Sequence, residues 1–282
     1  MTIYKSEAGA RLLRERYLDA LRAWPGPRDE VRVPTPEGET FVVVAGPAEA
    51  PPLMLLHGSG SNSAEWAHRI PSLTERFRVH AVDIIGEPGM SARTRPPLDS
   101  DRYARWLDAV LDHFDLARTA FLTSSFGGWL ALDYATRQPE RVAALALRCP
   151  IGLGPMKKGF VVKAVLLALL GEKGRRKSVA GVLGEPESSP IVAHQLLVSA
   201  NYRYRTGPFP VFGDAALGRL TMPVYAVAGA EDAMVDSATT KRRLEAAAGA
   251  VVDLVPGTGH YIPGEPDLDF LTHAAANGDF TA

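Results

Sequence analysis

Two adjacent serines, Ser124 and Ser125, lie where an apolar run gives way to a helical pattern. A sharp strand-to-helix turn exposes a serine hydroxyl for nucleophilic attack, and it requires small residues two positions before and after the serine. Ser125 meets this condition, since Thr123 and Gly127 flank it, whereas a leucine and a phenylalanine flank Ser124. Ser125 is therefore the candidate nucleophile. The alternative is that either serine only caps the helix.

A serine nucleophile needs a general base, and the base needs an acid that orients it. Asp232 and His260 follow two later apolar runs, and His260 lies in a loop rich in glycine. Taken singly, an aspartate here indicates a turn or a helix cap, and the histidine indicates an exposed loop. Their order after Ser125, each at the end of a strand-like run, favours a catalytic triad. Glu231 and Asp236 are the alternatives for the acid.

The segment LLHGSGSNSAEW, residues 55–66, has the composition of a loop that binds an oxyanion. A tetrahedral intermediate of acyl transfer needs preorganised N–H donors. One donor is expected from the residue after the nucleophile, Phe126, and another from the loop after an earlier strand. Ser59 is the predicted second donor, through its backbone N–H, with Gly60 as the reserve. Without the triad, a flexible Gly/Ser loop would be the better interpretation.

Short, continuously apolar runs recur along the chain and alternate with helical patterns. Such runs are typical of strands buried on both faces of a parallel sheet, and the alternation indicates βαβ units. The predicted buried strands are residues 52–58, 77–83, 118–124, 141–149, 223–229 and, more weakly, 251–257. The predicted helices are residues 6–24, 64–75, 101–115, 127–138 and 237–248, and a hairpin is expected within residues 30–46.

Residues 151–220 interrupt this alternation, because they contain no convincing strand and have scattered glycines and prolines. A simple crossover between consecutive strands needs far fewer residues. We therefore predict a helical cap, or lid, inserted over one end of the sheet. The core domain is expected to comprise residues 1–150, including the helix at 6–24, and residues 221–282.

Composition excludes several classes of partner. The chain has 282 residues, 46% of them hydrophobic, and a formal net charge of -1, which argues against nucleic acid or an anionic membrane as the main partner. Cys149 is the only cysteine, so no internal disulfide forms. The longest apolar stretch, 160–170, is shorter than the about 20 residues of a membrane span, and the N-terminus resembles no secretion signal. We expect a cytoplasmic monomer or homodimer.

The motifs HGSGSN, VDIIGEPGMS, TSSFGGW, GAED and GTGHYIPGEP occur in the order and spacing of the α/β-hydrolase superfamily. The chain resembles, over nearly its whole length, bacterial carboxylesterase-like serine hydrolases with a helical cap. The resemblance implies an α/β-hydrolase fold, with a mostly parallel central sheet flanked by helices and an inserted cap. Two positions depart from the family pattern: Thr123 replaces the usual glycine, and Ser124 replaces a frequent histidine.

Together, the residues and the resemblance predict a serine hydrolase that cleaves a carboxylic ester of a small, partly apolar molecule through an acyl-enzyme on Ser125. A thioesterase, lactonase or acyltransferase with the same triad is the alternative within enzymes, and a non-hydrolytic or ligand-binding protein of the same fold is the alternative outside them. No cofactor is expected. No metal-ligand cluster and no phosphate loop is evident in the sequence. Trp66, Trp129 and Met156 are candidate substrate contacts, with core packing as the alternative.

Overall fold

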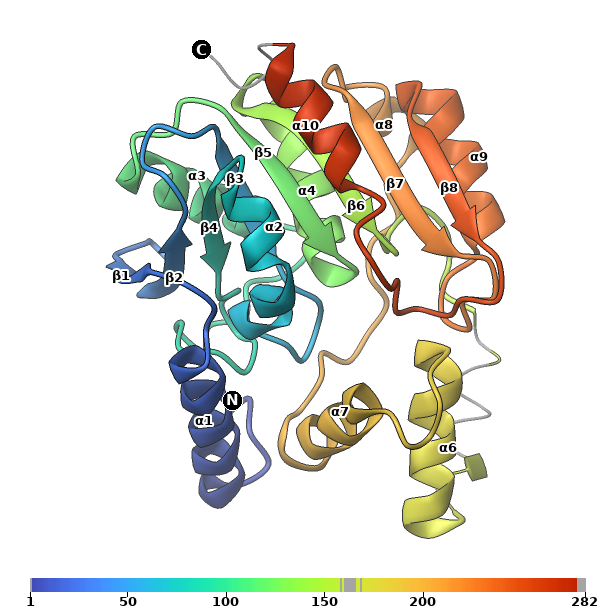
Figure 1. Ribbon diagram of the computed structural model, residues 1–282. Coiled ribbons are helices and arrows are strands. Elements are labelled where there is room, and N and C mark those ends of the chain that lie inside the picture. The colour runs from blue at the N-terminus through green and yellow to red at the C-terminus, as the bar shows by residue number, and fades with distance from the viewer. Residues whose placement is uncertain (1, 158, 160–165, 168, 278–282) are drawn as a thin grey trace.

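The computed structural model describes residues 2–157, 159, 166–167 and 169–277 (Figure 1). A single eight-stranded sheet in the order β1-β2-β4-β3-β5-β6-β7-β8 forms its centre. The strands are β1 (Arg28–Val33), β2 (Thr40–Ala45), β3 (Pro52–Leu56), β4 (Arg78–Val82), β5 (Thr119–Ser124), β6 (Val142–Arg148), β7 (Val224–Gly229) and β8 (Val251–Val255). All the predicted strands are present.

The sheet is antiparallel at one edge and parallel elsewhere. β1 and β2 form the predicted hairpin, and β2 also pairs antiparallel with β4. From β4 onward all neighbours pair in parallel, as the continuously apolar runs predicted. Every residue of β6 is buried, because helices cover the sheet on both faces. The carboxyl ends of the parallel strands consequently meet along one edge.

Two groups of helices cover the two faces (Figure 1). On one face, α3 (Arg102–His113), α4 (Phe126–Arg137), α8 (Asp214–Leu217) and α9 (Ser237–Ala248) pack around a large apolar cluster. On the other face, α1 (Glu7–Arg22), η1 (Ser63–Arg69), α2 (Ile70–Thr74) and α10 (Leu268–Ala276) enclose a second cluster. A short 3-10 turn, η2 (Pro139–Arg141), precedes β6. The prediction of an α/β-hydrolase fold is therefore confirmed.

One predicted helix differs in form. Residues 64–75 are not a single α-helix but the 3-10 helix η1 followed by α2. Pro71 lies in the first turn of α2, where its missing N–H does no harm, whereas inside a continuous helix it would remove a hydrogen bond. The first helix also begins one residue later than expected, because Ser6 is its N-cap and accepts a hydrogen bond from the Gly9 N–H.

The segment between β6 and β7 combines helices with irregular stretches in the part that the structure describes. It contains α6 (Gly171–Leu183) and α7 (Pro190–Asn201), which lie beyond the ends of β5, β7 and β8 (Figure 1). The predicted apolar stretch 160–170 falls partly outside the described residues. α7 packs on α1 through a small apolar cluster, and Tyr4 pairs with Tyr202 in an isolated bridge.

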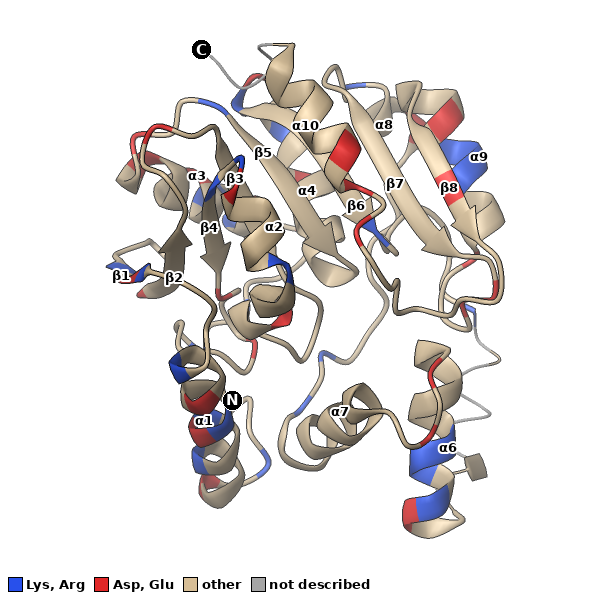
Figure 2. Ribbon diagram, in the orientation of Figure 1, with Lys and Arg blue, Asp and Glu red and all other residues tan. Residues whose placement is uncertain are grey.

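The surface of α6 is basic (Figure 2). Lys173, Arg175 and Lys177 are exposed there, and Arg176 has one acidic neighbour within reach, Glu172. These side chains form a charged face on solvent. Across the described residues, none of the helices combines the length and the apolar character needed to cross a lipid bilayer.

Candidate active site

Ser125 lies at a strained turn between β5 and α4. Its φ of 48° and ψ of -104° are in a region that non-glycine residues avoid, and its N–H donates to the Arg148 carbonyl at 2.8 Å. The strain is maintained by tight packing of α4 on the sheet. A Cβ atom on Gly127 would lie 2.2 Å from the Leu56 carbonyl oxygen, so only glycine fits there. The turn therefore lifts the Ser125 side chain above the strand ends.

Thr123 occupies the position where glycine is usual, and the structure shows how the turn accepts it. Its side chain is fully buried, and its hydroxyl faces the Ala146 carbonyl on β6 at 3.4 Å. The hydroxyl also lies 3.4 Å from the position that a Cβ on Gly128 of α4 would take, so the missing side chain of Gly128 leaves room for the threonine. Ser124 is half-buried, and its Oγ lies 3.6 Å from the position that a Cβ on Gly58 would take, beside the loop after β3.

The structure brings Ser125, His260 and Asp232 together, although they are far apart in sequence. His260 Nε2 lies 2.8 Å from Ser125 Oγ, and His260 Nδ1 lies 2.6 Å from Asp232 Oδ2. The Asp232 side chain is 1% exposed and that of His260 is 11% exposed. With the proton on Nδ1 donated to Asp232, Nε2 is left to accept the proton of the serine hydroxyl.

Asp232 is held as an anion by hydrogen bonds. Burial acts to raise the pKa of Asp232, but hydrogen bonds and the charge of the nearby His260 outweigh it, so the pKa lies below its ordinary value. The backbone N–H groups of Met234 and Val235 donate to Oδ1 at 2.7 and 3.0 Å. This arrangement leaves Oδ2 for the histidine.

The two alternative acids lie elsewhere. Glu231 is exposed. Asp236 is the N-cap of α9, where its carboxylate accepts hydrogen bonds from the N–H and the hydroxyl of Thr239. Neither carboxylate is hydrogen-bonded to His260 in the structure, so geometry selects Asp232 among the three.

The loop that carries His260 is held from two sides. The N–H groups of His260 and Tyr261 donate to the carbonyls of Val182 and Leu183 at the end of α6, at 3.0 and 3.2 Å. Beneath the loop, Arg148 donates to two of its carbonyl groups and to Asp267. The Arg148 contacts are Ile262 O at 2.5 Å, Gly264 O at 3.0 Å and Asp267 Oδ1 at 2.7 Å. The end of α6 and Arg148 on β6 therefore both position the histidine.

The loop after β3 lies beside the nucleophile turn. Its Gly58 N–H donates to Glu65 Oε2 at 3.0 Å, and its Gly60 N–H donates to Glu87 Oε2 at 2.6 Å. The reserve oxyanion donor, Gly60, is thus already bound to a carboxylate. Ser59 lies between the two engaged amides and is half-buried. Phe126, the other predicted donor, is the first residue of α4.

His57 shapes the same loop and is fully buried. Its Nε2 accepts a hydrogen bond from the Ile84 N–H at 3.0 Å, so the ring proton is on Nδ1, which donates to the Gly58 carbonyl at 2.8 Å. The ring is therefore neutral and joins the ends of two neighbouring strands. This contact pattern gives His57 a structural role and no role as a base.

The predicted substrate contacts have different positions. Trp66 is 2% exposed in the apolar cluster under η1 and α2. Trp129 is 1% exposed, and its indole donates to the Pro210 carbonyl while its ring packs on Phe212. Both indoles belong to the hydrophobic core, as their apolar area favours, so we do not propose them as substrate contacts. Met156 is half-buried in the segment between β6 and β7.

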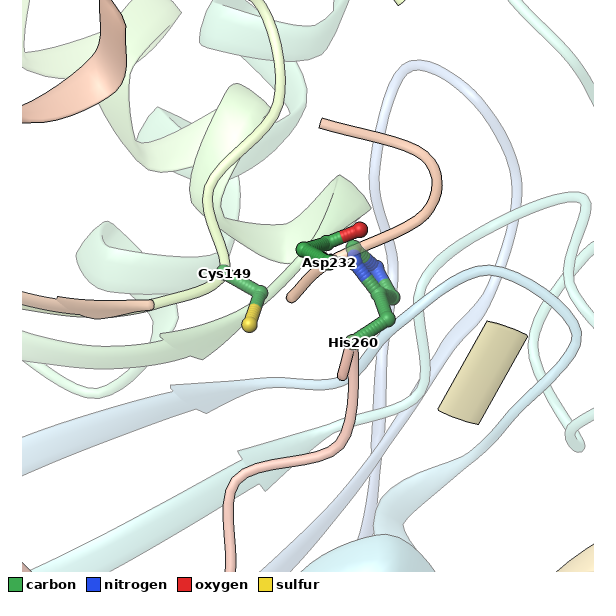
Figure 3. A group of neighbouring side chains, drawn as sticks. All are labelled: Cys149, Asp232 and His260. Carbon is green, nitrogen blue, oxygen red and sulfur yellow. Dashed lines mark hydrogen bonds and ion pairs between the residues drawn. The ribbon is translucent and has the colours of Figure 1, made fainter. Parts of the chain in front are cut away.

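Cys149 lies next to Asp232 and His260, as Figure 3 shows. The possible ligand atoms of Cys149, Asp232 and His260 all lie within 4.8 Å of one another. A metal site would need the thiolate, but burial raises the pKa of Cys149 to about 12, so the thiol is neutral at pH 7. The histidine and aspartate atoms are also engaged with each other at 2.6 Å. We therefore assign this group to hydrogen bonding and not to metal binding.

With this geometry established, comparison with known proteins shows what the chain is similar to. Residues 51–170 match the family model described as the alpha/beta hydrolase fold. The carboxylesterase YbfK of Bacillus subtilis is 26% identical over 270 residues, which cover 91% of this chain and 89% of that protein. The chain has the α/β-hydrolase fold. It is a carboxylesterase-like hydrolase, as the motifs predicted.

Solved structures agree with this assignment at the level of the fold. The crystal structure of the carboxylesterase CesB (YbfK) from Bacillus subtilis has a TM-score of 0.80 at 23% identity, covering 96% of this chain and 98% of that one. The naproxen esterase from Bacillus subtilis has a TM-score of 0.78 at 23% identity, covering 97% and 98%.

Proposed function

We propose that this α/β-hydrolase cleaves carboxylic esters of small, partly apolar molecules through an acyl-enzyme on Ser125. The observation that carries the proposal is the unbroken hydrogen-bonded series from Ser125 Oγ through His260 to Asp232, with distances of 2.8 and 2.6 Å, at a turn where the serine has a φ of 48°. The carboxylesterases among its relatives support ester hydrolysis as the reaction type.

In the proposed mechanism, Ser125 Oγ attacks the substrate carbonyl while His260 Nε2 takes its proton. Asp232 stabilises the imidazolium that forms, through the bond at Nδ1. The N–H groups of Ser59 and Phe126 stabilise the oxyanion of the tetrahedral intermediate. His260 then returns the proton to the departing alcohol. Water then attacks the acyl-enzyme while His260 takes its proton, and collapse of the second tetrahedral intermediate passes that proton to Ser125 Oγ and releases the carboxylic acid.

The proposed cap, residues 151–220, supplies contacts to this machinery. The end of α6 binds the His260 loop, and Lys157 Nζ donates to the Asp232 carbonyl at 2.8 Å. A substrate must enter between these segments and the strand ends. Met156, next to Lys157, remains a proposed contact with the substrate.

A phosphonate probe of serine hydrolases tests the nucleophile. We expect covalent labelling of the wild-type protein at Ser125 near neutral pH, and no labelling of Ser125→Ala. Turnover of an active ester should fall by about 10⁶-fold in Ser125→Ala, as in a well-studied serine hydrolase. Ser124→Ala is the matched control, since its hydroxyl is not part of the series, and it should keep most activity. The reverse pattern would assign the nucleophile to Ser124.

A matched panel of an ester, a thioester, a lactone and an amide with the same acyl group tests the reaction type. We expect the ester to have the highest kcat/KM. Preference for the thioester or the lactone would support the alternative hydrolases that share this triad. Absence of both turnover and labelling would leave a ligand-binding or non-hydrolytic protein as the answer.

A further inference from the structure

The loop after β3 is held by the turn after β4, and a buried acid carries one of the contacts. The loop comprises residues 57–63, and the turn comprises residues 83–92. The contacts are Gly60 N–H to Glu87 Oε2 at 2.6 Å, Asn62 Nδ2 to Pro88 O at 3.1 Å, and the Ser63 N–H and hydroxyl to Asp83 Oδ1 at 2.9 and 2.7 Å. Tyr17 on α1 donates to the same Asp83 oxygen at 2.8 Å. The conformation of the loop is thus imposed from outside it.

The Ser59 N–H belongs to the peptide unit that also contains the Gly58 carbonyl. That carbonyl accepts hydrogen bonds from His57 Nδ1 at 2.8 Å and from the Ser61 N–H at 3.3 Å. In a trans peptide the N–H points opposite to the C=O, so these bonds turn the Ser59 N–H away from His57 and Ser61.

The peptide units on either side are held by carboxylates. The unit before it carries the Gly58 N–H, which is bound to Glu65, and the unit after it carries the Gly60 N–H, which is bound to Glu87. Each peptide unit is planar and rigid, so securing both neighbours restricts the only rotations that would redirect the Ser59 N–H.

Glu87 is suited to this role by its surroundings. It is 1% exposed, and burial raises the pKa of its carboxyl. A buried carboxyl is retained only where a partner compensates for lost hydration, and here the Gly60 N–H is the backbone partner. Gly60 has a φ of 75°, and a Cβ on it would lie 2.6 Å from the Tyr204 ring, so the loop approaches both the acid and the cap segment closely.

We propose that Glu87 is a positioning residue for the oxyanion hole, which acts through Gly60 to aim the Ser59 N–H, with Glu65 performing the same task on the other side. The inference rests on the proposed function and deepens it. What matters is an acceptor atom at the right distance from Gly60. The negative charge of Glu87 is not required, because a neutral carboxyl or amide oxygen also accepts.

Two substitutions at Glu87 distinguish the effect of side-chain length, which places the acceptor oxygen, from the effect of charge. Glu87→Gln keeps the acceptor and the length but has no charge, whereas Glu87→Asp keeps the charge and withdraws the acceptor by one methylene. We expect Glu87→Gln to retain most of the wild-type kcat, and Glu87→Asp to lose about tenfold to 10²-fold, part of the 10²–10³ that removal of an oxyanion donor costs. KM for a p-nitrophenyl ester should change less than threefold in both. The opposite order would overturn the proposal.

A boronic acid, which forms a tetrahedral adduct with the nucleophile, reports on the oxyanion hole directly. Its affinity should fall in Glu87→Asp by the same factor as kcat/KM. Glu37→Met is the matched control for general destabilisation, because Glu37 is also a buried acid but pairs with Arg102 near the far edge of the sheet. We expect it to lower the free energy of unfolding and leave boronate affinity unchanged.

A double-mutant cycle completes the test. Ser59→Pro removes the N–H itself, so adding Glu87→Asp to it should cause no further loss of kcat. An equal loss in both backgrounds would show that Glu87 acts by another route and would refute the proposal. Labelling of Ser125 by the phosphonate decides the proposed function separately, since it depends on the nucleophile and not on the Glu87 variants.

Discussion

Asp232→Asn tests how the structure orients His260, the proposed general base. The asparagine side chain has two orientations at this site. With its oxygen at the Oδ1 position, it still accepts the N–H groups of Met234 and Val235, which now donate at 2.7 and 3.0 Å. Its NH₂ group then takes the place of Oδ2, the atom that lies 2.6 Å from His260 Nδ1 in the wild type. This orientation forces the proton of the imidazole onto Nε2, so the histidine no longer accepts the Ser125 proton.

The flipped orientation would restore the correct tautomer, but it places the NH₂ group against two backbone donors. An unsatisfied buried donor costs about 2 kcal/mol, so two of them disfavour the flip by about 4 kcal/mol. At about 1.4 kcal/mol per tenfold, roughly one molecule in 10³ has the productive arrangement. We therefore expect kcat to fall by about 10³-fold or more, in line with the about 10⁴-fold loss that the equivalent change causes in a serine protease.

Steady-state hydrolysis of an ester by Asp232→Asn measures this directly. KM should stay within about threefold, because Asp232 is behind the histidine and is 1% exposed. Asp236→Asn is the matched control: it weakens the cap of α9 but is not hydrogen-bonded to His260, so its kcat should equal that of the wild type. If Asp232→Asn kept kcat within tenfold, or if Asp236→Asn caused the larger loss, the assignment of the acid and the tautomer argument would both be wrong.

Three further predictions concern the scaffold. Burial lowers the pKa of His80 to about 4, so on acidification the unfolded chain takes up a proton near pH 6.5 while the folded protein does not. Lowering the pH from 7 to 5 should therefore reduce the free energy of unfolding, measured by urea titration, by about 2 kcal/mol. The His80→Leu variant should lack this loss. Gly127→Ala places a Cβ 2.2 Å from a backbone oxygen of β3 and should lower kcat/KM at least tenfold, whereas Gly181→Ala on α6 meets open space and should leave kcat/KM unchanged; equal kinetics for the two variants would contradict this. Asp267→Asn removes the carboxylate that pairs with the buried guanidinium groups of Arg148 and Arg69, so we expect the free energy of unfolding to fall by about 3–5 kcal/mol. A fall of under about 1 kcal/mol would refute this pairing.

The sequence by itself determined the sheet and the candidate triad. Continuous apolar runs are readable because a strand buried on both faces needs apolar residues at every position. Side-chain size at Thr123 and Gly127 distinguished Ser125 from Ser124, since a close strand–helix approach is a local steric demand. Asp232 and His260 could be located because parallel strands present their carboxyl ends at one edge, so position after a strand predicts proximity in space.

Only the tertiary structure decided which side chains hold these groups in place. Glu65 and Glu87 are separated by 22 positions and carry no periodic signal, yet both reach the same loop because β3 and β4 are neighbours in the sheet. The VDIIGEPGMS motif contains Glu87, but nothing in that motif indicates that Glu87 accepts a hydrogen bond from the Gly60 N–H. The network of Arg148 and Asp267 spans 119 positions and was equally invisible.

The same limit explains the positions of the two tryptophans. Trp66 and Trp129 are apolar and lie next to predicted site segments, but their burial depends on how helices cover the two faces of the sheet, which local sequence does not specify. The split helix has a local cause: hydrophobic spacing predicted one helix over residues 64–75, but Pro71 lies in the first turn of a second helix, so η1 and α2 form instead. Local steric and polarity patterns thus determined the elements and the reactive residues, while long-range hydrogen bonds between chain-distant polar groups determined their orientation.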